Sequence, residues 1–138
     1  MSIFNKFFRC TCPVTSALDI VGDKWTLVVI KLMLLEQKKT FKEFSESDES
    51  IAPSILSNRL KTLEKIGFIV KQKLPNNQKT NHYILTEKGL SLTPVITELA
   101  RWSHNNVRES DIYMLNMNVN NRSKLNQQII DKYKEIVL

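Results

Sequence analysis

The sequence has little glycine and proline, with three and four residues respectively among 138. Because these two residues interrupt helices and form turns, their scarcity predicts long helices joined by few loops. No run approaches the roughly 18 uncharged apolar residues of a membrane span, and the opening stretch MSIFNKFFRCTCP lacks the apolar region and small-residue cleavage site of a secretory signal. We therefore expect a mainly α-helical, cytoplasmic protein without a membrane partner.

Potential metal ligands and catalytic groups are also scarce. The only cysteines, Cys10 and Cys12, form a Cys-x-Cys pair that needs two further ligands before it can hold zinc. The two histidines, His82 and His104, fall in different predicted elements. There is no Gly-rich phosphate loop, no His–Cys or His–Asp pairing at a workable spacing and no carboxylate pair of a hydrolase. We expect no metal site, no cofactor and no enzymatic activity.

Charge is unevenly distributed along the chain. The formal net charge is +6, and the stretch from Arg59 to Lys79 has six basic residues against the single acid Glu64. The preceding segment 41–50 is net acidic. A concentrated basic region favours a polyanionic partner, most often nucleic acid, although a solvated basic surface explains the same composition.

Apolar spacing and capping residues divide the chain into helices and one hairpin. Helices are expected over residues 14–22, 24–37, 40–47, 53–66, 87–106 and 125–137, and strands over 68–74 and 82–86 around a turn at 75–81. The second helix is apolar nearly all round, which predicts a central position. Phe41 and Phe44 share one face of the third helix, and Thr86 is placed to cap the long helix that contains Pro94. An Asn-rich linker at 116–126 leads to the last helix.

The helix at 53–66 has one apolar face and one polar face. At about 100° of rotation per residue, its three leucines, Leu56, Leu60 and Leu63, fall together. The opposite side gathers Ser54, Ser57, Asn58, Lys61 and Lys65, and Arg59 lies on the flank. Hydroxyls, carboxamides and cations bond phosphate oxygens and base edges in the major groove of DNA. A helix with this pattern also serves core packing alone, so its spacing leaves both interpretations open.

The order of the elements favours DNA binding. A short helix, a turn, a helix with an exposed polar face and a hairpin with a basic tip form a helix-turn-helix followed by a wing. In this arrangement the second helix enters the major groove, and Asn77 and Lys79 of the hairpin lie on the adjacent backbone or minor groove. The sequence therefore predicts a mainly α fold with a small β-hairpin wing.

Four stretches of the sequence together resemble a known family. The stretches are CPVTSALDIVGDKWTLVVIKLML, FKEF, ILSNRLKTLEKIGFI and YILTEKGLSLTPVITELARW, and they extend from about Cys12 to His104. This combination is similar to the HxlR family of winged helix-turn-helix transcriptional regulators. The resemblance implies a homodimer on a pseudo-palindromic DNA operator, with the helix around Ser57 and Arg59 in the groove. It also implies dimer contacts through the first segment and the helices after the wing.

The expected domain organisation follows from this resemblance. Residues 1–138 form one winged helix-turn-helix domain, with a core at about 12–104 and a C-terminal helical extension at 105–138. The helix after the wing carries an apolar stripe that needs a partner, and we expect it to form the dimer interface: Leu92, Val95, Ile96, Leu99 and Trp102. A second stripe repeats every four residues at Leu125, Ile129, Tyr133 and Val137 and is expected to add dimer surface.

Cys12 is a candidate redox sensor. It directly precedes Pro13 at a helix start, where free backbone N–H groups favour a thiolate, and Arg9 is close enough in sequence to assist. The resemblance implies the same role, because oxidant-sensing members of the family use a cysteine at this place. Cys10 is then the candidate resolving thiol. A packed or inert thiol explains the same position.

The predicted function is that of a transcriptional regulator, with repression as the expected outcome and an unknown oxidant or small molecule as the expected effector. Two alternatives remain open. One is a winged-helix regulator that responds to a small-molecule ligand in the dimer cleft. The other is a winged helix used only for protein–protein contacts, which would not require cations such as Lys61, Lys65 and Lys79 beside small polar groups.

Overall fold

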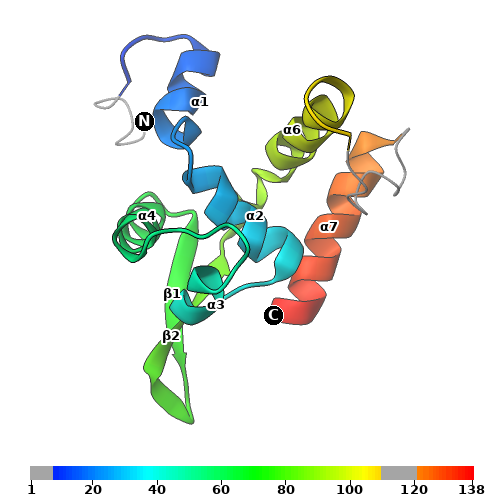
Figure 1. The fold of residues 1–138 in the computed structure, drawn as a ribbon. Coiled ribbons are helices and arrows are strands. Elements are labelled where there is room, and N and C mark those ends of the chain that lie inside the picture. Colours follow the sequence, from blue (N-terminus) through cyan, green and yellow to red (C-terminus); the bar gives the residue numbers. More distant parts are fainter. Residues whose placement is uncertain (1–7, 110–120) are drawn as a thin grey trace.

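The computed structural model describes residues 8–109 and 121–138 and shows a helical protein with one hairpin (Figure 1). Its elements are α1 (Pro13–Val21), α2 (Thr26–Glu36), α3 (Phe41–Ser45), α4 (Pro53–Lys65), β1 (Ile69–Leu74), β2 (Asn77–Leu85), α5 (Glu87–Leu90), α6 (Thr93–Asn106) and α7 (Arg122–Val137). The expected mainly α fold with a β-hairpin is confirmed. In Figure 1 the hairpin projects at one end, while α1 and α6 lie toward the other.

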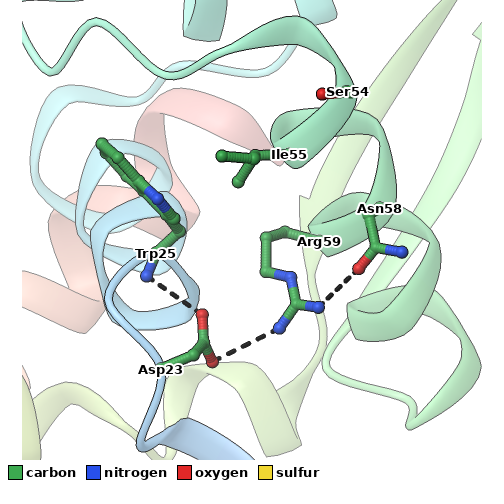
Figure 2. Close-up of a pocket in the computed structure, with 6 residues that line it drawn as sticks. All are labelled: Asp23, Trp25, Ser54, Ile55, Asn58 and Arg59. Atoms are coloured by element: carbon green, nitrogen blue, oxygen red, sulfur yellow. Dashed lines mark hydrogen bonds and ion pairs between the residues drawn. The ribbon is translucent and has the colours of Figure 1, made fainter.

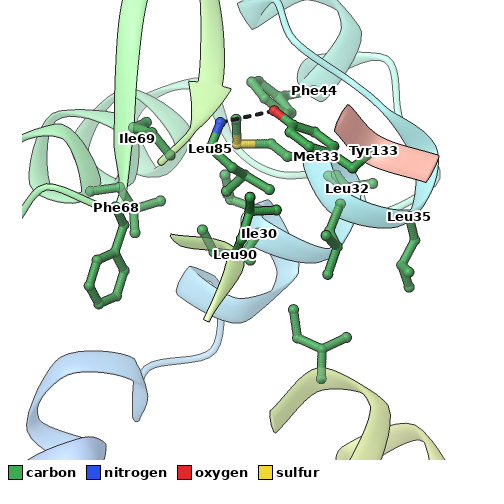
Figure 3. Close-up of a cluster of buried hydrophobic side chains, with 14 of the residues drawn as sticks. Ile30, Leu32, Met33, Leu35, Phe44, Phe68, Ile69, Leu85, Leu90 and Tyr133 are labelled. Atoms are coloured by element: carbon green, nitrogen blue, oxygen red, sulfur yellow. Dashed lines mark hydrogen bonds between the residues drawn. The ribbon is translucent and has the colours of Figure 1, made fainter. Parts of the chain in front are cut away.

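Helix α2 is the centre of the hydrophobic core, as its apolar sequence predicts. Its buried residues are Thr26, Val29, Ile30, Leu32, Met33, Leu34 and Leu35. The helix packs against α4, β2, α6 and α7, so it lies between several other elements. Figure 3 shows its side chains among those of Phe44, Leu85, Leu90 and Tyr133, which come from four other elements.

Helix α3 begins with a capping box. The backbone N–H of Glu43 donates to Oγ1 of Thr40 at 3.1 Å, and the Glu43 carboxylate accepts from the backbone N–H of Thr40 at 3.1 Å. Phe44 is completely buried, whereas Phe41 is 39% exposed. The expectation that both phenylalanines share one packed face is therefore wrong for Phe41. It stands at the first position of a five-residue helix, beside a groove that separates α3 from the wing.

The wing is an antiparallel hairpin in which Ile69 pairs with Leu85 and Leu74 pairs with Asn77. The turn is shorter than the predicted 75–81, because β2 begins at Asn77. The polar residues at the tip suggested a loop, but strand pairing in an exposed hairpin uses backbone groups and does not require apolar side chains. The backbone N–H of Tyr83 also donates to the carbonyl of Lys39 at 2.7 Å, which ties β2 to the segment before α3.

The long helix expected over 87–106 is two helices, α5 and α6, in the structure. Thr86 caps α5 as expected, because its Oγ1 accepts from the backbone N–H of Gly89 at 3.2 Å. Pro94 lies in the first turn of α6 rather than inside a longer helix. A proline has no N–H to donate to the preceding turn and its ring clashes with the carbonyl four residues earlier, so the chain restarts a helix at this point.

Helix α7 is part of the core of its own chain. The exposed fractions of Leu125, Ile129 and Tyr133 are 1%, 5% and 1%, and α7 packs against α2 and α6. The expectation that this stripe adds dimer surface is therefore wrong. The spacing of apolar residues predicts that a helix face is covered, but it does not predict whether the same chain or a second copy covers it. The helix begins at Arg122 behind an Asn121 cap, earlier than predicted, and residues 116–120 of the expected linker lie outside the described residues.

Candidate DNA interface

Helix α4 presents its polar face because its apolar face is anchored. Leu56, Leu60 and Leu63 are 0%, 2% and 1% exposed, and α4 packs against α2, α3 and β1. Pro53 occupies the first turn, where its missing N–H is not needed. No side chain caps this end, since position 52 is an alanine. Gly67, with φ +84°, follows the helix in the left-handed conformation that glycine adopts without strain.

Most of the polar residues predicted on α4 are accessible. Ser54, Asn58, Lys61 and Lys65 are exposed, and Ser57 is half-buried. The side chain of Arg59 is only 26% exposed, which agrees with its predicted place on the flank. The structure therefore brings two cations, a carboxamide and a hydroxyl onto one outward surface, hereafter the reading face, with donors and acceptors that suit phosphates and base edges.

Arg59 connects the reading face to the start of α2. Its Nη1 lies 3.4 Å from Oδ1 of Asp23, and its Nη2 donates a hydrogen bond to Oδ1 of Asn58 (Figure 2). The Asp23 carboxylate also accepts from the backbone N–H groups of Trp25 and Thr26, each at 3.0 Å. Partial burial raises the pKa of Asp23, but the Thr26 hydroxyl, these two N–H groups and the Arg59 charge outweigh it and lower the pKa below its ordinary value. Asp23 is therefore held in its charged form.

A hollow of about 290 Å³ lies between α4 and the segment before α2, and it is lined by Asp23, Trp25, Ser54, Ile55, Asn58 and Arg59. Figure 2 shows Trp25 and Ile55 facing each other across it. The predicted set of DNA-binding residues did not include Asp23, Trp25 or Ile55. Periodicity within one helix gives no signal for a contact between segments more than 30 residues apart.

The predicted wing residues lie at the hairpin tip. Asn77 and Lys79 are exposed, and Oδ1 of Asn77 accepts from the backbone N–H of Lys79 at 3.2 Å. Lys79 also lines a groove of about 500 Å³ with Phe41, Lys42 and Tyr83. The structure thus adds Lys42 of α3 as a second cation beside the wing, which sequence reasoning did not single out.

Cys12 is the N-cap residue of α1, as predicted, and its thiol is exposed. The backbone N–H and the hydroxyl of Thr15, with the backbone N–H of Val14, lower the pKa of the Cys12 thiol from its ordinary value. Arg9 does not assist, because it pairs with Asp19 at 2.8 Å. Cys10 is also exposed, and both thiols are free.

The predicted dimer stripe divides into two parts. Ile96 is 6% exposed and lies in the core of this chain, and the half-buried Leu92 packs against that core. Three residues of the stripe remain outside, with exposed fractions of 40% for Val95, 50% for Leu99 and 60% for Trp102. Helix α1 has no buried residue and exposes Val14 and Leu18. The apolar surface, as these five side chains are called hereafter, consists of two groups: Val14 and Leu18 on α1, and Val95, Leu99 and Trp102 on α6.

Within residues 8–109 and 121–138, no group of three or more His, Cys, Asp or Glu side chains is arranged to hold a metal ion. The same residues contain no helix with the length and apolar character to cross a membrane. At α4 and the wing, the exposed polar side chains supply hydrogen-bond donors, acceptors and cations.

Comparisons with known proteins agree with this geometry. The model of the HxlR-like helix-turn-helix family matches residues 20–111. The HTH-type transcriptional regulator YodB of Bacillus subtilis is 36% identical over 93 residues, which cover 67% of this chain and 82% of YodB. The HTH-type transcriptional regulator YybR of the same organism is 30% identical over 113 residues, which cover 82% of this chain and 90% of YybR.

Solved structures show the same architecture. The reduced form of YodB superposes with a TM-score of 0.60 at 33% identity and covers 74% of this chain and 100% of the YodB chain. The redox regulator HypR in its oxidised form superposes with a TM-score of 0.61 at 29% identity and covers 73% of this chain and 100% of the HypR chain. The predicted winged helix-turn-helix fold is confirmed. The chain belongs to the HxlR-like helix-turn-helix family of transcriptional regulators.

Proposed function

We propose that this protein is a homodimeric repressor that binds a pseudo-palindromic operator in double-stranded DNA and has no enzymatic activity. The observation that carries the proposal is the reading face of α4, where Ser54, Asn58, Lys61 and Lys65 are all accessible on a helix anchored by buried leucines. A helix with this face, preceded by α3 and followed by a hairpin, matches the docking geometry of a recognition helix in the major groove. The wing, with Asn77 and Lys79, contacts the adjacent backbone or minor groove.

The apolar surface supports a dimer. Trp102 and Leu99 are at least half exposed, and Val14 of α1 is 67% exposed. Clusters of large exposed apolar side chains mark protein–protein contacts more often than free surface. Figure 1 shows α1 and α6 at the end of the molecule away from the wing tip, so a dimer formed there leaves α4 and the wing free. All 138 residues act as one unit in this proposal, with α7 packed into the winged-helix core.

A two-fold dimer sets the spacing of the DNA contacts. Its two α4 helices lie about 34 Å apart, or a small multiple of one helical turn, so that they enter successive major grooves on one face of the duplex. Occupancy of such a site blocks access by other proteins without any additional contact. Activation requires a further contact with the transcription machinery, so repression needs fewer assumptions.

Fluorescence anisotropy with a random duplex across a salt series tests the DNA-binding proposal. Contacts between cations and phosphates release counterions, so the observed binding constant falls steeply with salt, with a logarithmic slope of about −0.9 per phosphate neutralised. A Lys79→Ala variant should bind more weakly and with a shallower slope. Salt-independent binding, or no binding by a folded dimer, contradicts the proposal and favours a winged helix used only for protein contacts.

A second proposal is that oxidation of Cys12 weakens operator binding. The exposed thiol at the start of α1, with its lowered pKa, supports this role. Among the solved relatives, HypR is a redox regulator and YodB was crystallised after diamide treatment. In the proposed step, the thiol of Cys12 and a thiol of the second copy form a disulfide. They lose two electrons and two protons, which diamide takes up to become the corresponding hydrazine.

Because α1 carries part of the apolar surface, a disulfide there shifts one protomer against the other and changes the distance between the two α4 helices. Operator affinity before and after diamide treatment tests this, with Cys12→Ser as the resistant control. If the affinity of the wild type does not change, Cys12 is an inert thiol. The remaining alternative is then an effector that binds as a small-molecule ligand in the dimer cleft.

A further inference from the structure

The carboxamide of Asn58 is held in one orientation by its neighbour in α4. Arg59 donates a hydrogen bond from Nη2 to Oδ1 of Asn58, while its Nη1 faces the carboxylate of Asp23 at 3.4 Å. Figure 2 shows the guanidinium between these two acceptors, with the Nδ2 of Asn58 pointing away from it. A guanidinium is a rigid planar fork of donors. The contact of Nη1 with Asp23 therefore determines where Nη2 meets Asn58.

Asp23 is itself held in place by hydrogen bonds from the start of α2. Asp23 Oδ2 accepts from the N–H groups of Trp25 and Thr26, each at 3.0 Å, and the Thr26 hydroxyl donates to Oδ1. The side chains of Arg59 and Asp23 are 26% and 35% exposed, so each is partly shielded from water. The orientation of Asn58 is thereby tied to the start of α2.

This orientation bears on which base Asn58 can bind. A carboxamide accepts through its oxygen and donates through its nitrogen. In the major groove adenine presents an acceptor and a donor, guanine and thymine present acceptors, and cytosine presents only a donor. With Oδ1 directed at Arg59, Nδ2 is the group left to extend from the reading face. We infer that Arg59 is a positioning residue that makes Asn58 a donor in the groove, so that cytosine, which presents no acceptor there, is disfavoured opposite Asn58.

The inference rests on the proposed DNA-binding function, and its test separates the two. Duplexes that bind the wild type are selected from a random library, and the affinity for each of the four bases is then measured at every position. The position contacted by Asn58 is the one whose preference disappears in Asn58→Ala. The wild type should disfavour cytosine there by about threefold to tenfold, the effect of one net hydrogen bond.

Arg59→Met keeps an unbranched side chain that favours the helix, and it removes the guanidinium that contacts both Asp23 and Asn58. Its discrimination at the Asn58 position should fall below about twofold, while the order of preference at other positions stays the same. The Asn58→Ala/Arg59→Met double variant should match Asn58→Ala at that position. Lys65→Met, the matched control, removes one charge from the same helix. It should lower the affinity for all sequences and keep the preference opposite Asn58.

Arg59→Lys provides a second variant should Arg59→Met prove unfolded in a melting curve. Lysine keeps the charge but has no fork to bridge Asp23 and Asn58, so it should also relax the preference. A wild type that prefers cytosine at this position overturns the inference, as does an unchanged preference in the folded Arg59 variants. Absence of selective, salt-dependent binding by the wild type overturns the proposed function itself.

Discussion

Replacement of Tyr133 by Phe tests the finding that α7 belongs to the core. The Tyr133 hydroxyl accepts a hydrogen bond from the backbone N–H of Leu85 at 2.9 Å, and only 1% of the residue is exposed. Phe fills nearly the same space, so the substitution leaves the Leu85 N–H without a partner at the base of the wing. A buried donor that loses its partner costs about 1–3 kcal/mol. The free energy of unfolding should fall by that amount.

Urea or thermal unfolding at one fixed protein concentration measures the effect, since the proposed dimer would make the melting temperature depend on concentration. For a chain of this size, each 1 kcal/mol lowers the melting temperature by roughly 3–5 °C. Tyr83→Phe is the matched control. Tyr83 is half-buried, water can replace its lost contacts, and the change should stay within about 0.5 kcal/mol.

The pH dependence of stability gives a second readout, of the burial of Tyr133. Burial raises the pKa of Tyr133, and the Leu85 N–H opposes this only in part. A raised pKa in the folded state means that the stabilising contribution is fully present below the unfolded pKa of about 10. It is lost as the pH rises through the folded pKa. Equal stability of Tyr133→Phe and the wild type at neutral pH would refute the assignment of α7 to the core.

Further predictions concern the apolar surface, the reading face and the thiol. Leu99→Glu combined with Trp102→Glu should convert the dimer into a folded monomer in light scattering, and an unchanged dimer would place the interface elsewhere. Asn58→Ala should relax base preference, with a loss of about 1–3 kcal/mol if the contact is bidentate and less if it is a single bond. Lys79→Ala should instead weaken binding to all sequences alike. If both variants lost the same affinity on every sequence, the proposed difference in role between Asn58 and Lys79 would be refuted. In a variant whose sole thiol is Cys12, thiolate absorbance at 240 nm should appear below the ordinary cysteine pKa, because hydrogen bonds from Thr15 and Val14 lower that pKa. A midpoint at or above the ordinary value would contradict this.

The two faces of α4 could be predicted from the sequence because a single helix is governed by local geometry. Leu56, Leu60 and Leu63 repeat at helical spacing, and the structure buries all three. The flank position of Arg59 followed from the same rotation. Its partner Asp23 did not, because the two residues lie 36 positions apart and meet only through the packing of α4 against the segment before α2.

Two of the wrong predictions share one physical cause, which is that apolar spacing predicts a covered helix face but not what covers it. The stripe of α7 was expected to meet a second copy and instead packs on α2 and α6. Ile96 was placed in the dimer interface and lies in the core for the same reason. The break before α6 had a local signal in Pro94, whose missing N–H does not permit an uninterrupted helix from 87 to 106.

Hydroxyl-radical footprinting of the wild-type dimer on a duplex selected from a random library tests the central claim, that paired α4 helices bind DNA, most directly. We expect two protected blocks related by two-fold symmetry, with centres about 34 Å apart or a small multiple of one helical turn. Asn58→Ala and Lys61→Ala should lose both blocks at the concentration that protects them in the wild type. A single protected block, no protection by a folded dimer, or protection unaffected by these substitutions would contradict DNA binding by paired α4 helices.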